Sequence, residues 1–169
     1  MLFDQVIDKR VSHRKFTERK VSDEDVNKLL DAAYKAPIAN GAYDDCRLTV
    51  IRDKNLLKDL VSEYQKVTGK KKDPLYDAGL FILFSSRKDT SARFEDAGCL
   101  LEHICLKAVE MGLGSCYIRG AINSIGKEGK YIEKLDLDDG FYPVSGVIVG
   151  HIDEEVLPKH HEIKTNFVL

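Results

Sequence analysis

The chain has little net charge and no long hydrophobic run. Its 169 residues include 26 lysines and arginines and 28 aspartates and glutamates, which gives a formal net charge of -2 at pH 7. A nucleic-acid-binding surface normally shows a basic excess, so we expect no nucleic-acid partner. A helix that crosses a bilayer needs about 20 consecutive apolar residues, and the apolar run Gly79–Phe84 is far shorter. We therefore expect no membrane-spanning segment.

Several motifs that would indicate a particular chemistry are also missing. The sequence contains no GxGxxG, P-loop, HExxH or GxSxG pattern. The adjacent pair His160-His161 cannot share one helical face, and the aspartates at 44–45 and 136–139 lack the spacing of a calcium loop. Hydrolytic and metal chemistry therefore have little support.

We expect a cytoplasmic protein, because the amino-terminal residues show no targeting segment. The four cysteines show no CxxC pair and no zinc-ligand spacing. We interpret all four as reduced and structural, with a redox-active thiol as the open alternative. The first residues, MLFDQVIDKR, place charges where a signal peptide needs an apolar core.

What the sequence does contain is an alternation of helix and strand signals. A capping serine, Ser22, begins one well-marked helix and Pro37 ends it. We expect helices over 2–9, 22–36, 55–67 and 91–111, a weak helix over 121–135, and strands over 47–52, 79–85, 115–119 and 144–150. This order predicts one layered α/β or α+β domain over residues 1–169.

The stretch 91–118 carries the strongest pattern. Ser91 is a candidate N-cap, and Glu95 and Asp96 place negative charge in the first turn of a helix. The rest of this helix is apolar nearly all round, so it should be buried nearly all round. It is either a core helix that also meets a second subunit or an ordinary core helix of a monomer.

Near the amino end, Arg10-x-Ser12-x-Arg14 places two guanidinium groups and a hydroxyl on one side of an extended segment. Such a set suits a phosphate dianion, because arginine binds it in a bidentate manner. The alternative is a solvated basic patch that pairs with acids elsewhere.

Taken together, several stretches resemble the FMN-dependent nitroreductase family. They are RVSHRKF at 10–16, the helix that ends Ala36-Pro37 before Ala39 and Asn40, Asp96-Ala97-Gly98, GLGSCYI at 112–118, and Val149-Gly150-His151. The resemblance covers nearly the whole chain in the right order. It implies an α+β fold with a nitroreductase-like mixed β-sheet flanked by helices and a long buried central helix. It also implies a homodimer with FMN at the interface.

The resemblance also implies a set of cofactor-binding residues. The amino-terminal segment Arg10, Val11, Ser12 and Arg14 would hold the FMN phosphate, with the ribityl chain nearby. The isoalloxazine would be lined by Pro37, Ile38, Ala39, Asn40 and Gly41, and backbone groups of Tyr117, Ile118, Arg119 and Gly120 would face its edge near N5. A further basic residue for the phosphate would come from the tail, with Lys159 as the candidate and His160 or His161 as substitutes. A cation near N1 and O2 would come from Lys70–Lys72 or from Arg119.

By resemblance, the function is an FMN-dependent oxidoreductase. It would transfer electrons from NADH or NADPH through flavin N5 to a nitroaromatic, a quinone or a similar acceptor in a ping-pong scheme. The flavin would carry the chemistry, with no side-chain acid or base required. One departure favours an alternative: residues 41–46 read GAYDDC where the family commonly has a Gln-Pro-Trp run. The alternative is a non-catalytic or ferredoxin-linked flavin-binding protein that acts as an electron relay or sensor.

Overall fold

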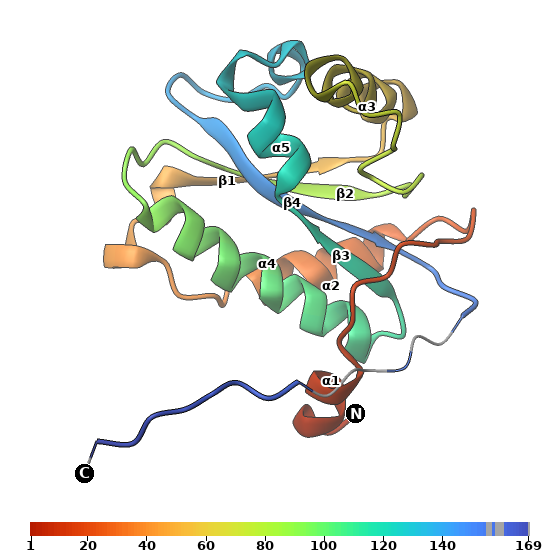
Figure 1. Ribbon diagram of the computed structural model, residues 1–169, viewed down its shortest axis with the longest axis vertical. Coiled ribbons are helices and arrows are strands. Elements are labelled where there is room, and N and C mark those ends of the chain that lie inside the picture. Colours follow the sequence, from red (N-terminus) through yellow and green to blue (C-terminus); the bar gives the residue numbers. More distant parts are fainter. Residues whose placement is uncertain (155–156, 158–160, 169) are drawn as a thin grey trace.

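Four antiparallel strands form one sheet in the spatial order β1-β2-β4-β3 (Figure 1). The structure, a computed structural model, describes residues 1–154, 157 and 161–168. The strands are β1 (Cys46–Ile51), β2 (Phe81–Ser86), β3 (Gly114–Ile118) and β4 (Tyr142–Gly150). The amino-terminal segment adds one parallel bridge, between Ser12 and Ser115. The α+β fold is confirmed, whereas the paired strands are all antiparallel and only this isolated bridge is parallel.

The strand β2 is the centre of the molecule, as its apolar run predicts. All six of its residues are buried, and it pairs with β1 on one side and β4 on the other. Ile82 and Phe84 belong to the core on one face of the sheet, and Phe81 and Leu83 to the core on the other face. This alternation follows from the two-residue period of a strand.

Helices cover both faces of the sheet (Figure 1). The helices α2 (Asp23–Ala33) and α4 (Ala92–Glu110) lie on one face, and α3 (Lys54–Thr68) and α5 (Gly120–Ile125) lie on the other. The short helix α1 (Phe3–Lys9) packs on α4, and single 3₁₀ turns occur at Ala39–Gly41, Tyr43–Asp45, Gly126–Glu128 and Lys130–Lys134. The expected weak helix over 121–135 is thus broken into short pieces, with Gly126 at a φ of 73°.

The two predicted helix caps have different outcomes. The side chain of Ser22 accepts a hydrogen bond from the Asp25 amide at 3.0 Å, so this cap is confirmed. The prediction for Ser91 is wrong, because Ser91 is itself helical (φ -59°, ψ -24°) and its side chain makes no capping bond. The amide of Arg93 already bonds to the Thr90 carbonyl, so the helical turn begins before the serine.

The long helix α4 is confirmed as the buried central helix. Eight of its residues are buried: Asp96, Ala97, Leu100, Leu101, Ile104, Cys105, Ala108 and Val109. Burial raises the pKa of Cys105 to about 12, so this thiol stays protonated at neutral pH. Cys99 lies on the exposed side of the helix, so one chain alone leaves part of the apolar cylinder uncovered.

The carboxyl-terminal residues 161–168 are exposed, and Figure 1 shows them running away from the body of the chain. Among the helices described, none has the length and apolar character needed to cross a membrane. Within the same described residues, no three histidine, cysteine, aspartate or glutamate side chains gather as they would around a metal ion.

Candidate functional site

The segment with the two predicted phosphate-binding arginines is fixed against β3. The amide of His13 donates to the Ser115 carbonyl at 2.8 Å, and the amide of Thr17 donates to the His151 carbonyl at 2.9 Å. The close approach requires glycine at position 114, because a Cβ there would lie 2.4 Å from Ile152 and 2.9 Å from the His13 ring. These two hydrogen bonds therefore hold the backbone of residues 12–17 in a fixed position beside the sheet.

The two arginines have different surroundings. Arg10 is half-buried, and its Nε lies 3.5 Å from the Glu102 carboxylate. Burial raises the pKa of Glu102, and the Arg10 charge opposes that rise. Arg14 is exposed, with its guanidinium 5.9 Å from the centre of the Tyr76 ring, and Lys72 Nζ lies 5.0 Å from the same ring centre.

These contacts bear on the alternative of a basic patch that the sequence left open. In the described part of the chain, neither Arg14 nor Lys72 forms an ion pair with a carboxylate. Only Arg10, which pairs with Glu102, therefore matches the alternative of a basic patch that pairs with acidic residues. The structure also singles out Lys72 from the lysine run 70–72, because it converges on Tyr76 with Arg14. The sequence could not make this choice, because exposed neighbours in a lysine run look alike.

The imidazole of His13 packs against Gly114 at the start of β3. It is 6% exposed, and its Nδ1 has no hydrogen-bond partner among the described residues. Burial lowers the pKa of His13, and the charge of Arg10 adds to the effect. The folded chain therefore holds this ring neutral at neutral pH.

The titration of His13 predicts a loss of stability in acid. The pKa of His13 is lower in the folded chain than its ordinary value of 6.5, so the unfolded chain binds more protons as the pH falls. We expect the contribution of His13 to the free energy of unfolding to be complete well above pH 6.5. It should decrease as the pH falls below that value. Urea unfolding between pH 5 and 8 measures this decline, and His13→Asn should flatten it while the exposed His161→Asn should not. An unchanged pH slope in the His13 variant would contradict the prediction.

The predicted loop Pro37–Gly41 is held by a buried ion pair at the start of α4. The Ala39 amide donates to Asp96 Oδ1 at 2.7 Å. Lys88 Nζ donates to Asp96 Oδ2 at 2.6 Å and to the Ala39 carbonyl at 3.1 Å. Sequence reasoning missed Lys88, and it used Asp96 for the helix dipole and for the family resemblance but not for an ion pair.

The same loop has an unusual backbone. Asn40 has a φ of 59° and Gly41 a φ of 63°, both in the left-handed region. Asparagine and glycine tolerate this region better than other residues. Of the predicted lining residues, Pro37, Asn40 and Gly41 are exposed, Ala39 is half-buried, and Ile38 is buried.

In the third predicted group, residues 117–120, mainly backbone groups remain to contact a ligand. The Tyr117 hydroxyl lies 2.8 Å from Ser145 Oγ, so that side chain is engaged inside the fold, and Ile118 is buried in the core beneath α5. Arg119 is exposed, with its guanidinium 5.1 Å from the centre of the Phe94 ring. Gly120 begins α5.

One chain does not bring all of these groups together. Figure 1 shows the segment 10–16 beside the carboxyl end of α4 and the 37–45 segment at its amino end. A helix of this length spans roughly 28 Å.

The remaining predicted residues lie elsewhere: Val11 is half-buried beside Ser12, and His161 is exposed in the tail. Lys159 and His160 lie outside the described residues.

With this geometry in place, the comparison with known proteins identifies the family. The sequence model of the nitroreductase family matches residues 7–151, so the chain belongs to the nitroreductase family.

Solved structures share the fold over nearly the whole chain. A nitroreductase with bound FMN from Desulfitobacterium hafniense DCB-2 is 22% identical, with a TM-score of 0.85, and the match covers 99% of this chain and 98% of that one. An FMN-dependent nitroreductase from Clostridium difficile R20291 is 25% identical, with a TM-score of 0.81 and 98% of both chains covered.

A curated relative extends the comparison to sequence. A protein of Archaeoglobus fulgidus with the provisional name NADH dehydrogenase/NAD(P)H nitroreductase is 30% identical over 112 residues. That match covers 64% of this chain and 62% of the relative, so the chain spans less than two thirds of the relative's length.

Proposed function

We propose that the protein binds FMN and transfers electrons from NADH or NADPH to a small acceptor such as a nitroaromatic or a quinone. The observation that carries the proposal is the fixed basic segment 10–14 in a chain of this family. Two structural neighbours are described as FMN-bound or FMN-dependent, and the curated relative carries NAD(P)H in its name.

The side chains present fit FMN. Arg14 and Lys72 lie exposed around Tyr76 with no ion-paired carboxylate among the described residues, and Arg10 meets Glu102 through Nε alone. The Nη groups of Arg10, the Arg14 guanidinium and the Ser12 hydroxyl can therefore bind a phosphate. Lys72 is the cation that we assign to the pyrimidine side of the flavin.

When bound, FMN would supply the redox chemistry, accepting two electrons from a nicotinamide and then reducing the acceptor in a ping-pong scheme. The chain itself would bind and orient the substrates. Lys72 would stabilise negative charge near N1 and O2, and backbone groups at 117–120 would face the opposite edge. No side chain in these groups is needed as an acid or base.

We further propose that two copies of the chain complete each site. The phosphate segment 10–14 and the loop 37–41 lie toward opposite ends of α4, so a partner's loop can reach a flavin that one chain's loop cannot. The tail supports this, because Ile163, Phe167 and Val168 are 87%, 82% and 98% exposed. Apolar side chains exposed in this way are typical of a segment that docks on another chain.

Removing the tail is therefore expected to weaken the dimer. A chain that ends after His161 should sediment as a monomer at concentrations where the full chain sediments as a dimer. A matched full-length variant with Ile163, Phe167 and Val168 replaced by serine should behave like the truncated chain, because the apolar contacts and not the length are lost. A full-length protein that is monomeric at tens of micromolar would contradict the proposal.

The altered loop 41–46 has a structural explanation. Arg87 Nε donates to Asp45 Oδ1 at 2.6 Å, and the Tyr43 hydroxyl donates to the Ala36 carbonyl at 3.3 Å. The acidic and aromatic residues that replace the family's usual run thus tie the loop to the fold.

The alternative, a ferredoxin-linked or non-catalytic flavin protein, rests on the short connection between β2 and α4. Only residues 87–91 join these elements, which leaves little chain to cover a nicotinamide.

An absorption spectrum of the purified protein, with the released flavin identified, tests the cofactor. Mixing the flavin-loaded protein with NADH, NADPH or a reduced ferredoxin then separates the two functions, because flavin bleached by ferredoxin alone would favour the alternative.

A further inference from the structure

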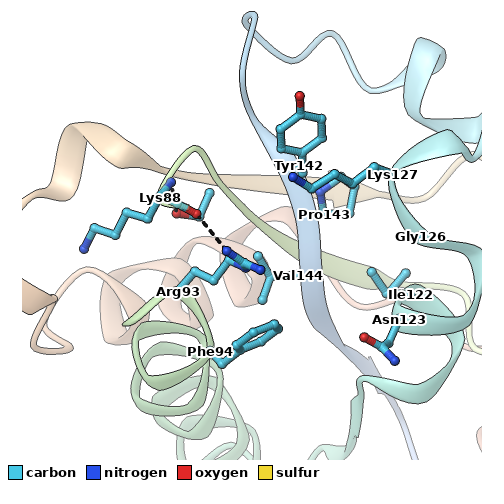
Figure 2. Close-up of a pocket in the computed structure, with 11 residues that line it drawn as sticks. Lys88, Arg93, Phe94, Ile122, Asn123, Gly126, Lys127, Tyr142, Pro143 and Val144 are labelled. Atoms are coloured by element: carbon cyan, nitrogen blue, oxygen red, sulfur yellow. Dashed lines mark hydrogen bonds between the residues drawn. The ribbon is translucent and has the colours of Figure 1, made fainter. Parts of the chain in front are cut away.

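A small cavity lies between the first turn of α4, the helix α5 and the start of β4 (Figure 2). Its volume is about 120 Å³. Figure 2 shows Arg93 and Phe94 on one side, Ile122 and Asn123 on the other, and Tyr142 with Lys127 above. Ligand pockets for whole small molecules usually measure about 300–1,000 Å³. This cavity can therefore hold one functional group of a ligand but not the whole ligand.

The charge around the cavity is of one sign. Its lining includes three cationic side chains and no carboxylate. The ammonium of Lys88 is used elsewhere, in the ion pair with Asp96. Arg93 and Lys127 remain, and in the described part of the chain Lys127 has no ion pair, only the Tyr142 ring at 4.1 Å.

Arg93 is held in place while part of its donor set stays free. Its Nη1 donates to the Lys88 carbonyl at 3.2 Å and to the Thr90 carbonyl at 3.3 Å. The Asp89 carboxylate also meets Nη1, at 3.8 Å, and is 95% exposed. Among the described residues no partner is recorded for Nε or Nη2, so a guanidinium fixed on one edge can donate two parallel hydrogen bonds from the other.

The cavity borders the predicted flavin edge. Two guanidinium groups lie near the Phe94 ring, that of Arg93 4.7 Å and that of Arg119 5.1 Å from its centre. Arg119 belongs to the 117–120 group, and Gly120 starts the helix that supplies Ile122 and Asn123 to the cavity wall. An anion in the cavity would thus be carried by a molecule whose remainder extends toward that edge.

We propose that this cavity is an oxyanion subsite, formed chiefly by Arg93 and Lys127, which binds a carboxylate or phosphate group of a substrate of the flavin. The substrate connection rests on the proposed function, whereas anion binding itself does not. Apolar walls from Phe94, Ile122 and Val144 exclude part of the solvent and strengthen the attraction. Two sources fit this chemistry: an acceptor with a carboxylate, and the 2′-phosphate of NADPH.

Calorimetric titration with inorganic phosphate tests the subsite directly. We expect Arg93→Met to weaken phosphate binding by about tenfold or more, because charge-assisted hydrogen bonds are lost. Lys127→Met, which removes an exposed side chain without hydrogen bonds to the fold, should weaken it less. Binding should survive Arg10→Ala, which separates this subsite from the proposed flavin-phosphate site.

A matched control is Arg47→Met. Arg47 also stacks on a phenylalanine, with its guanidinium 4.6 Å from the Phe141 ring centre, and also pairs with an exposed aspartate, Asp138. It lies outside the cavity, so phosphate binding should not change. Phosphate binding that is absent from the unaltered protein, or equal in the Arg93, Lys127 and Arg47 variants, would overturn the proposal whether or not the protein binds flavin.

Kinetics with the flavin-loaded protein then identify the source of the anion. If an acceptor carries it, Arg93→Met should raise KM for 4-nitrobenzoate about tenfold and leave KM for 4-nitrobenzamide and kcat unchanged. If the nicotinamide carries it, the same variant should raise KM for NADPH and not for NADH. An equal change for charged and neutral substrates in both pairs would overturn the assignment to a substrate.

Discussion

Replacement of Arg10 and Arg14 together by alanine is expected to abolish copurification of flavin. Each guanidinium can make charge-assisted hydrogen bonds to a phosphate, and the loss of such a bond costs about 1.5–3 kcal/mol. Two lost groups correspond to an affinity that is weaker by about 10²–10⁴-fold. Fluorescence titration of FMN into protein stripped of its flavin measures this change.

The control for this prediction comes from the same part of the chain. Arg19 is exposed and holds no ion pair in the described structure, so Arg19→Ala should bind FMN like the unaltered protein. The side chains of Arg10 and Glu102 are 35% and 45% exposed, and a pair that solvent reaches to this extent stabilises a fold by only about 0–1 kcal/mol. The double variant should therefore stay folded. Undiminished FMN binding by the folded double variant would show that other groups hold the phosphate.

The elements of the fold were predictable because their signals are local. The apolar run at 79–85, the Ser22 cap and the apolar cylinder of α4 each depend on residues close together in the chain, and each appears where it was expected. The Ser91 cap failed for an equally local reason. A serine near a helix start can cap it only if its own backbone is extended, and this serine is helical.

The candidate site was predictable only in part, because its contacts join distant parts of the chain. The arginine segment was visible as a motif, but the choice of Lys72 within the run 70–72 and the shared ring, Tyr76, were not. The contact between Ala39 and Asp96 spans 57 positions in sequence. The residues around Ala39 and those around Asp96 show no pattern that predicts this contact. It forms only because α4 packs beside the loop.

That buried contact gives the prediction with the largest expected effect on stability. Asp96 and Lys88 have side chains only 3% and 10% exposed, and together they bind both backbone groups of Ala39. Asp96→Ala leaves a buried ammonium without a counter-charge, which costs about 3–5 kcal/mol. Urea unfolding should show this loss. The exposed pair Lys134–Asp59 is the matched control, since Asp59→Ala should cost less than about 1 kcal/mol.

A double variant separates stability from positioning. Replacing Lys88 by methionine and Asp96 by leucine removes both charges, and such apolar replacements of a buried pair are often neutral or stabilising. We expect this variant to regain most of the stability lost in Asp96→Ala. Its FMN affinity should nevertheless stay below that of the unaltered protein, because Ala39 has lost the two bonds that hold the loop 37–41. Full recovery of FMN affinity would mean that the ion pair serves the fold alone.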